Sequence, residues 1–170
     1  EYDHVLGSVH NLRGMEDFYF MKNLTLDDAD KLLKQYFDEI IEMLKWGKFD
    51  VLAHLPYPLR YFYSQSNLEI DLNNYKKQID EILSMTAKSD KALEINTGGL
   101  RQPINKLSPE VDIVKRFKEL GGKYVSVGSD AHYAEHLAAD IDMAYNCALE
   151  AGFDSITFFQ KHTPLQMKIE

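Results

Sequence analysis

Cysteine is almost absent from this sequence, since Cys147 is the only one among 170 residues. A single cysteine forms no disulfide within the chain, which excludes a disulfide-stapled secreted domain and favours a reducing cytoplasm. Long apolar runs are also missing, because no stretch approaches the roughly 18 consecutive apolar residues of a membrane span. The chain does not open with a signal-peptide pattern. We therefore expect a cytoplasmic protein with no membrane partner.

Positive charge is scarce too, with 19 Lys and Arg against 27 Asp and Glu and a net charge of −8. This balance argues against nucleic acid as a partner held by bulk charge. Hydrophobic residues make up 45% and charged residues 27%, which is ordinary for a globular chain and excludes a disordered tail. The length suits one domain, so residues 1–170 are interpreted as a single domain.

Hydrophobic periodicity indicates strands that alternate with helices. The predicted strands are residues 5–9, 50–55, 92–96, 124–127 and 155–159, with a short tail strand at 165–169. The predicted helices follow a Thr25 cap up to Gly47, then cover residues 72–83, 109–120 after a Ser108 cap, and 134–151. Residues 12–23 and the aromatic stretch 57–67 are predicted to be irregular. This alternation predicts a parallel sheet of about five core strands, either open and doubly wound or part of a β/α barrel.

Ionisable or polar side chains stand at the ends of four successive predicted strands: His10, His54, Glu94 with Asn96, and Asp130 with His132. Parallel strands end at one common rim, where α/β enzymes hold their active sites. Imidazole and carboxylate together are ligands for zinc, iron or manganese. The spacing of Asp130 and His132 places both on one side of an extended chain. The pattern therefore predicts a metal site at this rim.

Each of these residues also has a purely structural interpretation. His10 or His54 alone could be a hydrogen-bonded histidine at a strand end, Glu94 could pair with a lysine, and Asp130 could cap the next helix. Their coincidence on one rim favours the metal site, because buried charges need partners. The histidines at 4, 136 and 162 are assigned structural or surface roles.

Two arginines, Arg60 and Arg101, follow the strands that end at His54 and Asn96. A guanidinium group binds phosphate through two parallel hydrogen bonds, although either residue could also be an ordinary surface arginine. Gly98 and Gly99 do not form a phosphate loop, because the GxGxxG and GxxxxGK[ST] spacings are absent. The aromatic residues from Tyr57 to Tyr63 could line a pocket, but core packing is the favoured interpretation.

Four blocks occur in the order found in the PHP (polymerase and histidinol phosphatase) superfamily: GSVH at 7–10, DVLAH at 50–54, ALEINTGGLR at 92–101 and GSDAH at 128–132. The sequence is most similar to the histidinol-phosphatase branch. This resemblance implies a distorted (β/α)7 barrel, of which the chain holds the C-terminal part, with up to three divalent ions at the strand ends. The metal motifs that the family carries upstream of GSVH are absent from this chain.

The resemblance also implies roles for individual residues. His10, His54, Asp130 and His132 would be metal ligands, and Asp130 and His132 would take part directly in catalysis. Arg101, with Arg60 and Asn96, would bind the substrate, and Glu94 would support the site from behind it. The implied cofactors are divalent Zn, Fe or Mn.

The implied reaction is hydrolysis of a phosphomonoester, namely L-histidinol phosphate in histidine biosynthesis, so the partner is a small phosphorylated substrate. Two alternatives stay open, which are a PHP phosphoesterase with another substrate and a non-catalytic metal-binding or interaction fragment. Exposed edges of an incomplete barrel would also favour self-association.

Overall fold

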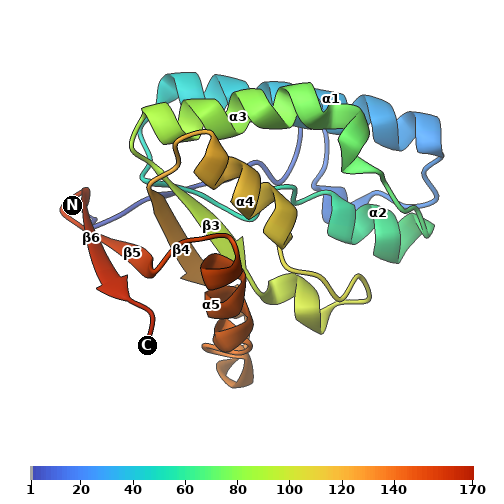
Figure 1. Cartoon of the computed structure of the whole chain (residues 1–170). Coiled ribbons are helices and arrows are strands. Elements are labelled where there is room, and N and C mark those ends of the chain that lie inside the picture. Colours follow the sequence, from blue (N-terminus) through green and yellow to red (C-terminus); the bar gives the residue numbers. More distant parts are fainter. Residues whose placement is uncertain (1) are drawn as a thin grey trace.

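A computed structural model describes residues 2–170 as a parallel sheet covered by helices, with a separate hairpin beside it (Figure 1). The strands are β1 (Leu6–Gly7), β2 (Val51–Leu52), β3 (Ala92–Asn96), β4 (Tyr124–Gly128), β5 (Ser155–Gln160) and β6 (Thr163–Lys168). The α-helices are α1 (Leu26–Trp46), α2 (Leu59–Ser66), α3 (Lys76–Lys88), α4 (Val111–Glu119) and α5 (Ile141–Glu150). Short 3-10 turns are η1 (Phe18–Phe20), η2 (Leu72–Tyr75), η3 (Gly98–Arg101) and η4 (Ala134–His136). The four strands of the main sheet are parallel and lie in the order β1-β2-β3-β4.

The longest helix, α1, begins and ends where the sequence predicts. The Thr25 hydroxyl accepts a hydrogen bond from the Asp28 amide, and the Asp28 carboxylate accepts one from the Thr25 amide, which is a capping box. Gly47 ends the helix with φ of 72°, a left-handed conformation that glycine adopts without steric cost. Leu33, Phe37 and other apolar residues at helical spacing are fully buried. Helix α1 lies beside α3, and together they cover the sheet (Figure 1).

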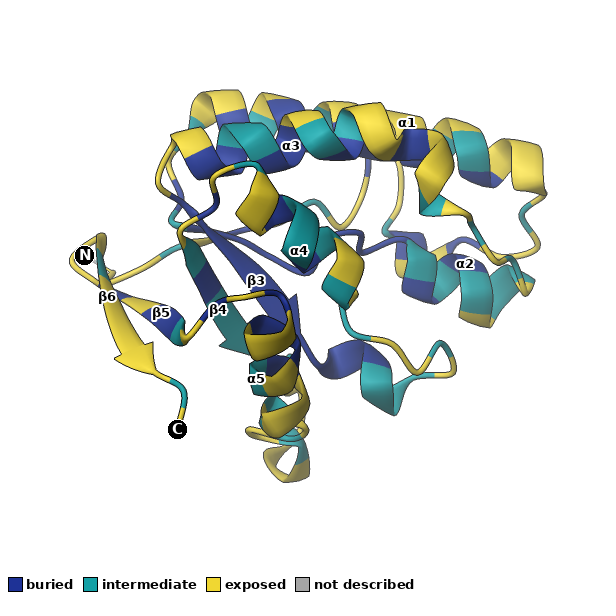
Figure 2. Cartoon of the chain, viewed as in Figure 1, coloured by how far each residue is buried: buried dark blue, intermediate teal, exposed yellow. Residues whose placement is uncertain are grey.

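Successive side chains of β3 point to opposite faces of the sheet, and this places its polar groups on one face. The whole strand is buried (Figure 2). Leu93 and Ile95 point to the helix side and belong to the main core, whereas Glu94 and Asn96 line a cavity on the opposite face. The register places Glu94 beside Ser126 of β4. The sheet therefore has one apolar face packed under helices and one face that carries the ionisable groups.

The predicted strands at 5–9 and 50–55 are shorter in the structure, at two residues each. The Asp50 carboxylate accepts a hydrogen bond from the Val5 amide at 2.8 Å. This side-chain bond takes the place of a backbone bond between β1 and β2 at the beginning of both strands. His54 has a positive φ of 30°, which turns the chain away from the sheet directly after Ala53.

The last predicted core strand, 155–159, does not join the parallel sheet. Instead, β5 pairs with β6 in an antiparallel hairpin, and β6 covers 165–168 of the tail strand predicted at 165–169. Lys161 and His162 at the turn both have positive φ, at 49° and 60°, as a tight two-residue hairpin loop requires. Turn chemistry of this kind is hard to see in a Lys-His pair, because asparagine and glycine are the usual signals.

Three other expectations about elements were wrong. Residues 59–66 form helix α2 rather than an irregular stretch, because burial of Phe62 and Arg60 outweighs weak helix propensity. The predicted helix 134–151 is split, since Asp140 has a φ of 59° and α5 begins only at Ile141. Helix α4 begins at Val111, whereas Ser108 exchanges backbone hydrogen bonds with Asn96 at 2.9 and 3.0 Å.

Among residues 2–170, no helix is both long and apolar enough to cross a membrane.

Candidate functional site

Two neighbouring cavities lie at the carboxyl ends of the parallel strands. The inner cavity, of about 460 Å³, lies on the open face of the sheet and includes Glu94, Asn96 and Ser126 in its lining. The outer cavity, of about 560 Å³, is lined by residues from η1, α2, η3 and the loop after β4. Every predicted site residue lines at least one of them: His10, His54, Arg60, Asn96, Arg101, Asp130 and His132. His10, His54 and Asp130 line both, so they stand at the boundary between the cavities.

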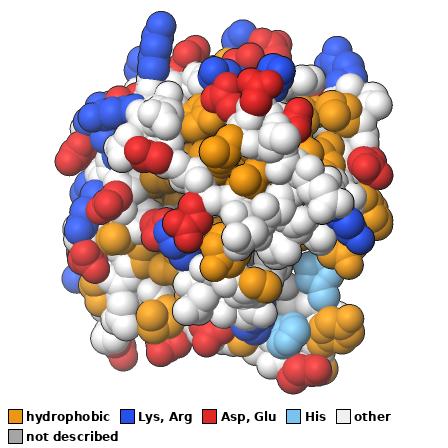
Figure 3. All heavy atoms as spheres, turned by 90° about the vertical axis from the view of Figure 1, so that its right-hand side faces the viewer, with side chains coloured by type: hydrophobic (Ala, Val, Ile, Leu, Met, Phe, Trp, Pro, Cys, Tyr) orange, Lys and Arg blue, Asp and Glu red, His pale blue; other side chains and the backbone are white. Residues whose placement is uncertain are grey.

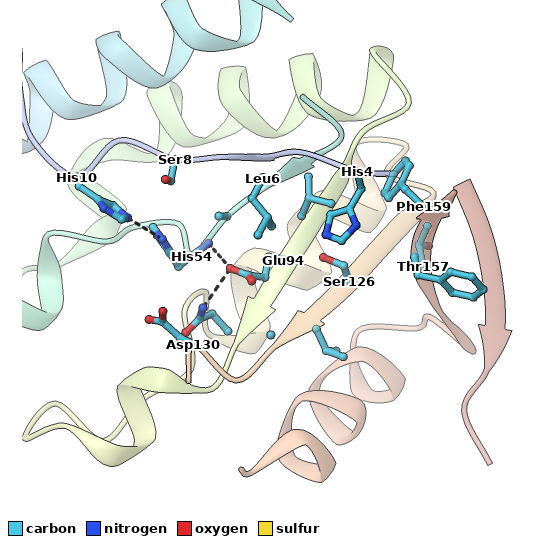
Figure 4. Close-up of a pocket in the computed structure, with 16 residues that line it drawn as sticks. His4, Leu6, Ser8, His10, His54, Glu94, Ser126, Asp130, Thr157 and Phe159 are labelled. Atoms are coloured by element: carbon cyan, nitrogen blue, oxygen red, sulfur yellow. Dashed lines mark hydrogen bonds between the residues drawn. The ribbon is translucent and has the colours of Figure 1, made fainter. Parts of the chain in front are cut away.

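The closest contact between side chains of the predicted ligands is that of the two imidazoles (Figure 4). Nε2 of His10 lies 3.1 Å from Nε2 of His54, although the residues are 44 positions apart in sequence. Two imidazole nitrogens on one tetrahedral zinc ion, each about 2.0–2.1 Å from it, stand about 3.3 Å apart. The two imidazoles are thus arranged as adjacent ligands of one divalent ion would be.

The protein holds His54 in the form that a metal needs. Its backbone amide donates to Oε2 of Glu94 at 2.8 Å, and its side chain is buried. Burial, together with the nearby charges of Arg60 and His10, lowers the pKa of His54 to about 3. The imidazole is therefore neutral at physiological pH, with a lone pair available for a metal ion.

Glu94 organises this region from the middle of β3. Its Oε2 also accepts from the Asn96 side chain at 3.2 Å, and burial raises the pKa of this carboxyl. A Cβ on Gly128 would lie 2.2 Å from Oε1 of Glu94, so a side chain there would displace the Glu94 carboxylate. Oδ1 of Asn96 accepts from the Gly98 amide at 2.9 Å. Asn96, predicted to bind substrate, is only 2% exposed, and its side chain makes these two contacts at the floor of the inner cavity.

Arg60 and Asp130 form an ion pair across the site. Nη1 of Arg60 donates to Oδ2 of Asp130 at 3.0 Å, and the arginine side chain is only 2% exposed. Burial alone would raise the pKa of Asp130, but the hydrogen bond and charge of Arg60 outweigh burial and lower it. Asp130 is therefore ionised, as a metal ligand must be.

The other donors of Arg60 have no partner. Its Nε and Nη2 are buried and form no hydrogen bond within the described residues 2–170. These two nitrogens share one edge of the guanidinium plane, which is suited to a two-point contact with an oxyanion. Unmatched buried donors cost about 1–3 kcal/mol each. Arg60 therefore carries two unmatched buried donors on a side chain that lines the outer cavity.

Arg101 and His132 lie further out. Arg101 donates to the backbone oxygen of Ser129 and lies 3.4 Å from Oδ2 of Asp140. The side chain of His132 is 76% exposed, and its Nδ1 lies 3.9 Å from Oδ1 of Asp130. Figure 3 shows histidine side chains gathered near one end of the molecule, beside hydrophobic groups. Arg101 and His132 both line the outer cavity.

The metal site is only partly assembled by this chain. Residues 2–170 contain no group of three or more His, Cys, Asp and Glu side chains close enough to hold one metal ion. The chain brings His10 and His54 together and keeps Asp130 nearby, but binds its carboxylate to Arg60. The four-residue ligand set therefore stays a prediction, with its two imidazoles in a fitting arrangement.

Several cavity residues were not in the predicted site: Asp17, Tyr19, Tyr57, Tyr61 and His136. The ring of Tyr57 stacks on His10 with 4.4 Å between centroids, and its hydroxyl lies 3.2 Å from Oδ1 of Asp17. Core packing was the favoured interpretation of the aromatic stretch, and it holds for Phe62 and Tyr57, which belong to the core; Tyr61 packs against that core, and Tyr57 and Tyr61 also line the outer cavity. The sequence places Tyr57 only three residues after His54, and this short spacing could have indicated that Tyr57 belongs to the site.

Comparison with known proteins supports this description of the fold. The chain is 34% identical over 160 residues to a probable histidinol-phosphatase of Clostridium acetobutylicum, which covers 90% of this chain and 61% of that protein. It is 38% identical over 113 residues to a probable histidinol-phosphatase of Thermotoga maritima, covering 66% of this chain and 46% of that protein. The chain thus spans about half to three fifths of the length of these relatives.

Two solved structures share the fold. The first is a histidinol phosphate phosphatase of Lactococcus lactis complexed with zinc, L-histidinol and phosphate, with a TM-score of 0.75 and 26% identity. The match covers 96% of this chain and 62% of that one. The second, a putative histidinol phosphatase of Listeria monocytogenes, has a TM-score of 0.59 at 19% identity, covers 81% of this chain and 56% of that one, and supports the fold alone.

The predicted α/β fold of the PHP type is confirmed by these structures, with four parallel strands in place of about five. A sequence model of the PHP domain matches residues 1–98, more than half of the chain. The match covers the strand ends of His10 and His54 and the whole of β3. The chain therefore belongs to the PHP domain family.

Proposed function

We propose that the protein takes part in metal-dependent hydrolysis of a phosphomonoester, with L-histidinol phosphate as the substrate. The relatives that match most of this chain are named histidinol-phosphatases, and the Lactococcus lactis structure holds zinc, L-histidinol and phosphate. Because the chain spans 61% of the Clostridium acetobutylicum relative, the activity is proposed for the complete barrel, to which this chain contributes the residues below. The extent of the domain, residues 1–170, also stays a prediction.

The proposed metal is zinc, with iron and manganese as alternatives and up to three ions in the complete site. His10 and His54 would hold one ion, and Asp130 and His132 would be further ligands. A bound divalent ion supplies a nucleophile at neutral pH and stabilises negative charge on the phosphoryl group. Glu94 would keep His54 in place through its backbone amide, and the stacked ring of Tyr57 would restrict rotation of His10.

The free edge of Arg60 is the observation that carries the phosphate proposal. Nε and Nη2 are buried and unmatched within residues 2–170, next to the carboxylate and imidazoles proposed as ligands. A phosphate oxygen pair would satisfy both donors and place the ester beside the metal site. Arg101, on the same cavity, would neutralise further charge on the phosphate. The proposed catalytic roles of Asp130 and His132 depend on their positions beside Arg60 and the proposed metal ligands.

The test is phosphate release from L-histidinol phosphate by the purified protein with its complete barrel, with zinc added and then removed by a chelator. We expect turnover with zinc that a chelator abolishes and zinc restores. Turnover of other phosphomonoesters but not of L-histidinol phosphate would favour a PHP phosphoesterase with another substrate. Zinc bound at defined stoichiometry without any hydrolysis would instead favour a non-catalytic metal-binding module.

A further inference from the structure

The outer cavity carries a carboxylate that neither the metal nor the phosphate proposal uses. Asp17 lines this cavity together with Arg60 and Arg101. We propose that Asp17 binds the protonated amine of the substrate and so selects phosphate esters of amino alcohols. This inference rests on the proposed substrate, because L-histidinol phosphate carries a phosphate and a primary amine on adjacent carbons.

The Asp17 carboxylate is held firmly through one oxygen. Oδ1 accepts from the backbone amide of Tyr19 at 2.8 Å and from the hydroxyl of Tyr57 at 3.2 Å. The first of these bonds caps the η1 turn. Oδ2 forms no hydrogen bond within residues 2–170, and Asp17 forms no ion pair with any cation there. The turn thus fixes the carboxylate and leaves one oxygen for a ligand.

Tyr57 connects this carboxylate to the proposed phosphate-binding arginine. The guanidinium carbon of Arg60 lies over the face of the Tyr57 ring, 5.2 Å from its centroid, while the hydroxyl of the same ring donates to Asp17. Burial and the neighbouring Tyr61 and Asp17 groups raise the pKa of Tyr57, so it stays a neutral donor. A cation over the ring face and an anion at the ring hydroxyl are therefore both held next to one rigid side chain. A ligand with a phosphate and an ammonium group can contact both.

The remaining charges of the cavity favour Asp17 over other acceptors. Asp130 is already paired with Arg60 at 3.0 Å, and its other neighbours are the proposed metal ligands. Tyr19 and Tyr61 stand beside Asp17 in an edge-to-face contact, with 5.6 Å between centroids. Aromatic rings attract cations through their faces and reduce competition from water. The tyrosine-lined side of the cavity therefore suits an ammonium group, and the arginine side suits a phosphate.

The test compares two ligands that differ only in the amine. Dissociation constants for L-histidinol phosphate and for 3-(imidazol-4-yl)propyl phosphate are measured by calorimetry with a chelator present, so that no hydrolysis interferes. We expect the unaltered protein to prefer the amine-bearing ester by about tenfold or more. Asp17→Asn, which keeps the Oδ1 acceptor but removes the charge, should bring this preference close to one. Glu16→Gln removes the same charge from the adjacent exposed residue and should keep the preference.

A second variant keeps the test valid if Asp17→Asn does not fold. Tyr57→Phe removes the hydroxyl that orients Asp17 but keeps the ring, and it should reduce the preference by a smaller factor. Equal affinity of the unaltered protein for both esters, no binding of either, or a full preference in both variants would overturn the proposal. Hydrolysis is scored separately, so a preference that depends on Asp17 without phosphate release would contradict the proposed function alone.

Discussion

At the scale of single residues, the His10–His54 pair decides whether this chain can hold a metal ion. The two Nε2 atoms are 3.1 Å apart, and burial keeps His54 neutral. The distance is a property of both rings together, whereas the lowered pKa of His54 comes first from burial and then from the charges of Arg60 and His10. Their combination is the strongest geometric support for the proposed metal site.

Replacing one of these imidazoles should therefore weaken zinc binding. We expect His10→Ala to lower zinc affinity by at least about tenfold, as even loss of a residue behind a ligand costs 10–100-fold. Calorimetric titration with zinc measures the change. His162→Ala is the matched control, because His162 pairs with Asp50 and lines neither cavity. Equal loss in both variants would contradict the assignment of His10.

Arg60 is the second residue whose role is set by its surroundings. We expect Arg60→Lys to weaken binding of inorganic phosphate by about tenfold, because an ammonium group cannot make the two-point contact of a guanidinium edge. The affinity is measured as product inhibition of phosphate release. Arg13→Lys, at an exposed position outside both cavities, should leave this inhibition as it is. Unaltered inhibition in Arg60→Lys would exclude the free edge of Arg60 as a phosphate site.

At the scale of elements, helix α1 supplies much of the core behind the sheet and depends on its first turn. The capping box pairs Thr25 with Asp28 through reciprocal hydrogen bonds. Thr25→Ala should lower the free energy of unfolding by about 1 kcal/mol, because it leaves an amide at the helix start without its partner. Urea denaturation measures this change. Thr25→Ser keeps the hydroxyl and should retain most of the stability; a loss equal to that of alanine would exclude the capping bond as the cause.

Helices α3 and α4 are joined by a two-point ion pair, in which Asp80 accepts from Nε and Nη2 of Arg116 at 2.8 and 2.9 Å. The Arg116 hydrogen bonds lower the pKa of Asp80 below its usual 3.8. A carboxyl with a lowered pKa in the folded state stabilises above its unfolded pKa, and this stabilisation disappears as the pH falls through the folded value.

Asp80→Asn should therefore reduce the free energy of unfolding by about 0.5–1 kcal/mol near neutral pH, an estimate that allows for the partial exposure of the pair. The difference from the unaltered protein should shrink below about pH 4. Urea denaturation at neutral and acidic pH checks both statements. Asp27→Asn, in an exposed ion pair with Lys31, should change stability less at either pH. A difference that does not depend on pH would contradict the electrostatic explanation.

At the scale of the whole molecule, the sheet is open. In the part of the chain that the structure describes, β1 pairs only with β2, and β4 pairs only with β3. The inner face of the sheet carries a cavity rather than a second layer of helices. Unpaired strand edges invite pairing with another chain. We therefore propose that this chain associates with itself.

Sedimentation velocity should show an average mass that rises above that of the monomer as concentration increases. Leu6, on the β1 edge, is 52% exposed, and Leu6→Lys should reduce association because a charge on an edge strand opposes pairing. Leu26→Lys exchanges another exposed leucine, at the start of α1, and should have little effect. A mass that stays monomeric at all concentrations, or an equal effect of both variants, would rule out the edge as the cause.

Local sequence patterns predicted an element correctly where its cap, its apolar spacing and its end residue all indicated the same element. Thr25, the apolar spacing of α1 and Gly47 all indicate the same helix, and the structure has it. The aromatic helix α2 and the break at Asp140 were missed, since both depend on contacts and backbone angles that no short pattern records. The β5–β6 hairpin was missed for a related reason, because strand pairing is a choice between distant partners.

The sequence by itself determined that polar groups end the strands, and hence that His10, His54, Asn96 and Asp130 reach one rim, because parallel strands share a direction. Only the tertiary structure decided which of them touch: the two imidazoles meet, Asp130 pairs with Arg60, and Tyr57 joins Arg60 to Asp17. Strand direction is a property of the backbone pattern, whereas these contacts depend on side-chain rotamers and on loops that approach from distant parts of the chain.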